Sequence, residues 1–139
     1  MIAIAESWKA MYPQAHVGIL TMRGVKGPER HPELDRLKKE LEDDLRALFK
    51  HAGQLKDLEP IRAYQAYYKR FKKTYHVVQQ LESVAIKGKP IPQVSALVEA
   101  MFMEELRNML LTAGHDLDAI KQPLTLAVAD GTETYIKIN

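Results

Sequence analysis

The sequence predicts an α+β fold, a single domain over residues 1–139 in which about four helices pack with strands from both ends of the chain. Three patterns predict this class: an apolar run without helical spacing near the N-terminus, several stretches with helical spacing, and alternating apolar residues near the C-terminus. A chain of 139 residues suits one core, with at most a hairpin appended. The composition, 46% hydrophobic and 27% charged, is that of an ordinary globular protein.

The first predicted elements are short. Residues 2–5 are expected to form a strand, and residues 6–11 a single helical turn that ends before Pro13. The run AHVGILTM, residues 15–22, is rich in apolar and β-branched residues without helical spacing, so it predicts a buried strand. Two glycines, a proline and several charges then indicate a surface loop over residues 23–31.

The best-marked helix begins at Pro32, which suits a first helical turn, and two acidic residues follow it near the positive end of the helix dipole. Lys50 and His51 are expected in the last turn, and Gly53 supplies a stop signal. Five leucines at offsets of three and four form one apolar stripe: Leu34, Leu37, Leu41, Leu45 and Leu48.

Three further helices are predicted, one over about residues 58–74, one over about residues 77–86, and one that begins near Pro92 and ends before Gly114. The apolar face expected for the last of them comprises Val94, Leu97, Val98, Met101, Phe102, Leu106, Met109 and Leu110.

The pattern changes near the C-terminus. Residues 124–128 alternate, Asp130 and Gly131 suit a turn, and residues 135–138 appear extended, so a hairpin is predicted. An exposed C-terminal strand could pair with a second copy of the chain, which makes a homodimer an expected partner arrangement.

The composition and motifs exclude several classes of function. Without cysteine there is no disulfide or thiolate nucleophile, and the chain has neither a secretory signal nor a membrane span, so a cytoplasmic protein without membrane partners is expected. Neither a dinucleotide fingerprint nor a phosphate-binding loop is present, and no histidine pair has zinc-site spacing, so no cofactor, metal or catalytic residue is assigned. The one tight cluster of ligand-type side chains is His115, Asp116 and Asp118, where capping of a short turn is the expected role of the aspartates.

A net charge of +2 means that an electrostatic partner must be recognised by a local patch. Residues 54–73 carry six basic and two acidic groups, and the segment IRAYQAYYKRFKKTYH also holds five aromatic residues, a composition typical of a nucleic-acid surface. On a helix, the aromatic residues fall within one arc and the basic residues on the opposite side and flanks, so the aromatics are expected in the core and the basic groups in solvent. The candidate RNA-contacting residues are Arg62, Lys69, Arg70, Lys72 and Lys73.

A family resemblance covers about half of the chain, residues 67–135. The runs GKPIPQVSALVEAMF and AGHDLDAIKQPLTLAVADG resemble the B3/B4 domain of the phenylalanyl-tRNA synthetase beta chain, which has a segment of the type G-x-x-[IL]-P-x-[IV]-x-x-[IL]-V-[DE], then D-L-D, a strand and an acidic-Gly turn. The matching residues are Gly88, Ile91, Pro92, Val94, Leu97, Val98, Glu99, Asp116, Leu117, Asp118 and the turn at Asp130 and Gly131.

The resemblance implies a free-standing α+β domain with a mixed sheet packed against the helices, associated with tRNA or an aminoacyl group. In bacterial synthetases the same domain hydrolyses mischarged tyrosyl-tRNA. It also implies that the family domain continues beyond residue 139. Two departures affect the implied pocket: Met101 and Phe102 stand where the family tends to have Thr-Asn, and the family histidine falls on Ala113, two places before His115. The residues that the resemblance places in the pocket are Glu99, Phe102, His115 and Asp116.

Three functions therefore stay open. The first is binding of tRNA or another RNA without aminoacylation, the second is a protein-interaction or structural module, and the third is a trans-editing hydrolase of misacylated tRNA.

Overall fold

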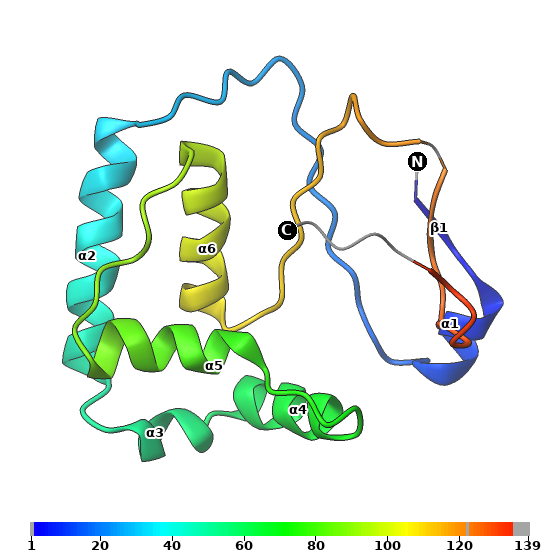
Figure 1. Cartoon of the computed structure of the whole chain (residues 1–139), viewed down its shortest axis with the longest axis horizontal. Helices are drawn as coiled ribbons and strands as arrows, with labels where there is room; N and C mark the ends of the chain where they lie inside the picture. Colours follow the sequence, from blue (N-terminus) through cyan, green and yellow to red (C-terminus); the bar gives the residue numbers. More distant parts are fainter. Residues whose placement is uncertain (1, 122, 135–139) are drawn as a thin grey trace. The chain divides into compact units, whose positions relative to one another are not determined.

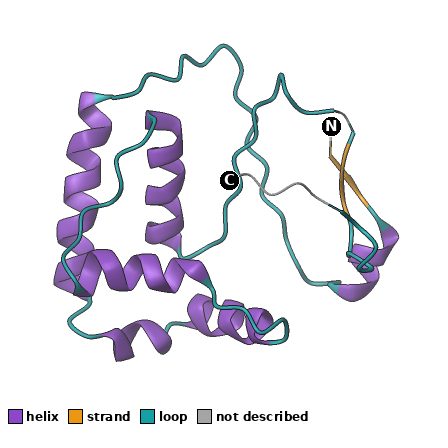
Figure 2. Cartoon of the chain, viewed as in Figure 1, coloured by secondary structure: helices purple, strands orange, loops and turns teal. Residues whose placement is uncertain are grey.

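A computed structural model describes residues 2–121 and 123–134 of the chain. The backbone divides into two compact units, one formed by residues 1–23 with 115–139 and the other by residues 24–114. Figure 1 shows the course of the chain through both. Helices make up most of the regular structure and strands very little (Figure 2), so the fold is mixed α+β and mostly helical.

The first unit holds the strands. Strand β1 (Ile2–Ile4) pairs in parallel with β2 (Leu124–Leu126), with Ile2 opposite Leu124, and the amide of Ala5 extends the ladder to the Leu126 carbonyl at 2.9 Å. Helix α1 (Glu6–Met11) follows β1, as predicted. None of the described residues of this unit is buried.

Only the first strand of the predicted C-terminal hairpin lies within the described residues. This strand exists as β2, but the partner of β2 is β1, from the other end of the sequence. The second strand, expected over residues 135–138, lies outside the described residues. Among the described residues β2 is therefore part of a parallel pair, which joins segments that are far apart along the chain and which neighbouring sequence does not predict.

The strand predicted over residues 15–22 is wrong. These residues follow an irregular path, and Val17, Ile19, Leu20 and Met22 are exposed. A high content of β-branched and apolar residues favours a strand only where a second strand can accept its hydrogen bonds, and no such partner exists among the described residues.

The second unit is helical. Helix α2 (Pro32–Leu48) confirms the predicted leucine helix, and it begins with proline in its first turn as expected. The predicted stop is wrong, because Phe49 already leaves the helical conformation (φ −112°, ψ 120°) and is buried, while Gly53 lies within the next helix, α3 (Ala52–Lys56). The Gln54 side chain caps α3 by accepting hydrogen bonds from the amides of Lys50 (2.6 Å) and His51 (3.2 Å).

Helix α4 (Glu59–Lys69) begins where predicted and ends five residues early. The helix predicted over residues 77–86 is confirmed as α5 (His76–Leu81), which continues into a π-helical turn, η1 (Glu82–Ile86). Helix α6 (Ala96–Asn108) packs beside α2, and α5 contacts α6 near one end (Figure 1).

The hydrophobic core belongs entirely to the second unit among the described residues. Leu41 and Leu45 of the leucine stripe are buried, Leu34 and Leu37 are partly buried, and Leu48 is 64% exposed. The core comprises Leu41, Leu45, Phe49, Leu55, Ile61, Tyr75, Val77, Val78, Leu81, Val84, Ala85, Ile91, Met103 and Leu106.

The face predicted for the last helix is confirmed only in part, by the buried Leu106 and by Met109, which packs against the core. Val94, Leu97 and Val98 are exposed, whereas the buried residues of α6 include two glutamates, Glu99 and Glu105. Sequence periodicity assigns carboxylates to solvent, but here hydrogen-bond donors satisfy both of them inside the unit.

These buried carboxylates hold irregular segments in place. Glu99 accepts a hydrogen bond from the Val94 amide (2.9 Å), and Glu105 accepts one from the Thr112 amide (2.8 Å). Glu42 of α2 does the same for the Ile91 amide (2.7 Å), so α6 begins at residue 96, after an extended segment fixed by side chains, and not near Pro92.

None of the helices within residues 2–121 and 123–134 combines the length and the apolar character needed to cross a membrane.

Candidate nucleic-acid interface

The end of α4 is a tight turn built from basic residues. The Lys73 amide donates to the Tyr68 carbonyl (3.1 Å), and the Lys72 amide donates to the Lys69 carbonyl (3.0 Å). Lys72 adopts a left-handed backbone conformation with φ 54°. This pair of bonds closes a helix C-terminus, and its left-handed position is usually occupied by glycine. A lysine there is a departure from local backbone preference.

The aromatic residues of the segment separate into two groups, and the first belongs to the core. The Tyr75 ring is fully buried and stacks on Tyr64 at 4.4 Å between centroids, with Tyr68 at 5.5 Å. The Tyr75 hydroxyl donates to the Met109 carbonyl at 3.0 Å, and burial, assisted by Tyr64, Glu105 and Tyr68 nearby, raises its pKa above the ordinary value. The prediction that the aromatics lie in the core is confirmed for this group.

The second aromatic group lies at the surface, and for it the same prediction is wrong. Tyr67 is 40% exposed and Phe71 is 57% exposed, with ring centroids 5.3 Å apart and the planes tilted by 59°. The guanidinium carbon of Arg70 lies 4.8 Å from the centre of the Tyr67 ring and 5.8 Å from that of Phe71, within cation–π distance of both. A surface hollow is lined by Ala66, Tyr67 and Arg70.

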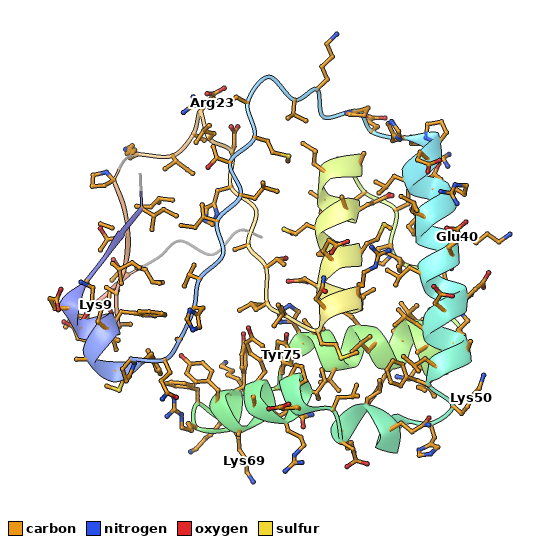
Figure 3. The ribbon with its side chains drawn as sticks, turned by 180° about the vertical axis from the view of Figure 1, so that it is seen from behind. Lys9, Arg23, Glu40, Lys50, Lys69 and Tyr75 are labelled. Carbon is orange, nitrogen blue, oxygen red and sulfur yellow. The ribbon has the colours of Figure 1, made fainter. Side chains whose placement is uncertain are left out.

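The five predicted basic residues are all exposed, and four of them follow one another closely at the end of α4. Figure 3 shows the Lys69 side chain extending away from this helix. Among the described residues none of the five forms an ion pair with a carboxylate, and residues 60–81 contain no acidic residue. We define the basic turn as Lys69, Arg70, Lys72 and Lys73; Arg62 lies about two turns before Lys69 on α4.

The four predicted pocket residues are not brought together within one unit. Glu99 and Phe102 lie on α6 in the helical unit, whereas His115 and Asp116 belong to the other unit and are exposed. Asp116 caps a short turn by accepting from the Asp118 amide (3.0 Å), which confirms the capping role predicted for it.

Glu99, one of the four predicted pocket residues, accepts hydrogen bonds from within the helical unit. Its carboxylate accepts from the Lys38 ammonium at 2.7 Å and from the Val94 amide at 2.9 Å, and the side chain is almost fully buried. Both oxygens are therefore engaged in holding α2 and the preceding segment. In the described part of the chain, no three His, Asp or Glu side chains are placed to hold a metal ion.

Sequence reasoning missed Tyr67 and Phe71 as surface residues. The available signal was the run KRFKK, because four charged residues around one phenylalanine leave too little apolar surface to continue a core-facing helix. Ending the helix at residue 69 would have removed Phe71 from the buried stripe.

No family model, curated protein or solved structure matches this chain.

Proposed function

We propose that this protein binds RNA through the basic turn and Arg62, without aminoacylating it. The observation that carries the proposal is the set of five exposed basic side chains that have no carboxylate partner among the described residues. Their charges are thus available to phosphates, whose neutralisation releases counterions and supplies most of the affinity of non-specific nucleic-acid binding.

The spacing of these residues suits a phosphate backbone. Lys69, Arg70, Lys72 and Lys73 are four of the five residues 69–73 on a tight turn, so their side chains spread in several directions from a compact backbone. The resemblance of residues 67–135 to the B3/B4 domain makes tRNA the RNA to test first.

The test is a filter-binding titration of the whole chain with bulk tRNA at several salt concentrations. Changing Arg62, Lys69 and Lys73 to Ala should weaken binding similarly for unrelated RNA sequences. It should also flatten the plot of log affinity against log salt by roughly 2 to 3 units, since each lost phosphate contact removes about 0.7 to 0.9.

A matched control removes three exposed lysines from the same unit but outside the basic turn: Lys26, Lys87 and Lys89. This control has the same net charge as the first triple variant, so a general charge effect would weaken both equally. Binding that is lost equally in both variants, or unaltered in the first, contradicts the proposed site.

A second candidate function, a protein-interaction module, is favoured by the exposed apolar side chains Val94, Leu97 and Val98 at the start of α6. Such a module would bind no tRNA at any salt concentration. The third alternative, a hydrolase, would be favoured by turnover of tyrosyl-tRNA that His115→Ala abolishes.

A further inference from the structure

The exposed aromatic pair Tyr67 and Phe71 lies within the same short segment as the basic turn. Arg70 and Lys72 flank Phe71 in the sequence, and Lys73 follows Lys72. The Arg70 guanidinium also lies within cation–π distance of both rings. Aromatic rings on a basic surface are poorly explained by phosphate binding alone, because phosphates offer no apolar face.

The backbone turn fixes where Phe71 is placed. The Phe71 amide donates to the Tyr68 carbonyl at 3.0 Å, and Lys73 donates to the same carbonyl at 3.1 Å. Phe71 is therefore held by bonds on both sides of it, so its exposure results from an ordered helix terminus. In the same segment Tyr75 is fully buried, which shows that the core already accommodates an aromatic ring there.

We propose that Tyr67, Arg70 and Phe71 form a stacking surface for unpaired bases, and that the RNA bound by this protein is single-stranded at the basic turn. The proposal rests on the proposed function. Rings and a guanidinium plane can stack on a base of any sequence, while the neighbouring lysines contact the backbone on either side of it.

Duplex RNA fits this surface poorly. The faces of its bases are covered by neighbouring base pairs, so neither ring could stack on a base and only the basic side chains would contact the RNA. Single-stranded RNA should therefore gain affinity from both kinds of residue, and duplex RNA from one kind.

The experiment measures the binding of fluorescein-labelled decauridylate and of a duplex RNA with the same number of phosphates. We expect the wild-type chain to prefer the single strand by at least about fivefold, the least that one stacked base contributes. Replacing both Tyr67 and Phe71 by Leu keeps every charge and an apolar side chain. It should weaken single-strand binding by about 5- to 150-fold per stacked base, leave duplex binding unchanged and preserve the salt slope.

Two controls accompany the double variant. Phe71→Tyr retains the ring and should bind the single strand like the wild type. Leu48→Ala removes an exposed apolar side chain from α2 and should have no effect. Thermal melts establish that each variant is folded. The preference of the wild-type chain for single-stranded over duplex RNA is measured without any variant, so it tests the proposal even if a variant does not fold.

The outcomes separate the two proposals. If the wild type binds neither RNA at low salt, the proposed function fails and the stacking surface fails with it. If it binds both RNAs equally, with a steep salt dependence, or if the double variant binds the single strand as tightly as the wild type, RNA binding stands and the stacking surface alone is refuted.

Discussion

Helices α2 and α4 belong to the same unit and both bury one face, yet they use their basic residues in opposite ways. On α2, Arg36 pairs with Glu33 at 2.6 Å and with Glu40, and Arg46 pairs with Glu42 at 3.1 Å. The Arg36 guanidinium, by hydrogen bonding and charge, lowers the pKa of the Glu33 carboxyl below its ordinary value. On α4 and the basic turn no basic side chain has such a partner among the described residues.

The difference teaches that the number of basic residues is a poor guide to a binding surface. Arg46 also donates to the carbonyls of Val84 (3.3 Å) and Lys89 (3.3 Å), so it holds η1 and the following segment against α2. The charge of Arg46 is used within the fold, whereas the basic side chains of the basic turn are exposed and have no carboxylate partner among the described residues.

The largest effect is expected within α2 itself. Leu41→Ala should lower the free energy of unfolding by about 2 to 5 kcal/mol, because it opens a cavity among buried side chains. Leu48→Ala, in the same leucine stripe but 64% exposed, should change it by less than about 0.5 kcal/mol. Denaturant melts of the two variants measure the difference. Equal losses would mean that the stripe is buried along its whole length.

Replacing one lysine on each helix by methionine tests whether its charge contributes to the stability of the fold. Lys38→Met on α2 leaves the buried Glu99 carboxylate without its cation, and we expect a loss of about 2 to 4 kcal/mol of stability. Lys69→Met on α4 removes a solvated charge and should change stability by less than about 0.5 kcal/mol. If denaturant melts show the two variants to be equally stable, the proposed contrast between internal and available charge is refuted.

The smallest effect concerns the backbone of the basic turn. Lys72→Gly should stabilise the fold by about 0.5 to 1 kcal/mol, because glycine adopts φ 54° without the steric cost that lysine incurs. The same change should weaken RNA binding, since it removes one cation from the basic turn.

Lys73→Gly is the matched control for this variant. It removes an equal charge from a neighbouring position that lacks a positive φ. It should weaken RNA binding similarly and gain no stability. A gain in thermal melts for both variants would assign the effect to relief of charge repulsion and not to the backbone.

Local signals in the sequence were sufficient for the starts of α2 and α4, but not for the ends of these helices, for α3 or for the start of α6. Pro32 marks the start of α2, and the leucine spacing marks the side of α2 that faces the core. Pro60 marks the start of α4. These signals act over one or two turns of chain, so they do not depend on tertiary contacts. The exposure of Arg62 and Lys69 also followed from the amphipathicity of α4, whereas Lys72 and Lys73 lie beyond its last residue.

Long-range contacts decided what local signals could not. The partner of β2 is 122 positions away in the register that joins Ile2 to Leu124, and the buried face of α6 depends on donors from α2 and from loops that satisfy Glu99 and Glu105. A prediction from periodicity places every charged side chain in solvent. A carboxylate can be buried instead only where a specific hydrogen-bond donor reaches it, and the sequence does not show which donor that will be.

The candidate site shows the same division at the scale of a few residues. The sequence by itself determined that basic and aromatic residues occur together in residues 61–76. Only the tertiary structure decided that Tyr75 is buried and Phe71 exposed, because the core has room for a ring at one of these positions and the chain turns away from it at the other. The physical reason is that a turn closed by backbone hydrogen bonds interrupts the helical period, and side chains beyond it no longer follow the face on which the helix began.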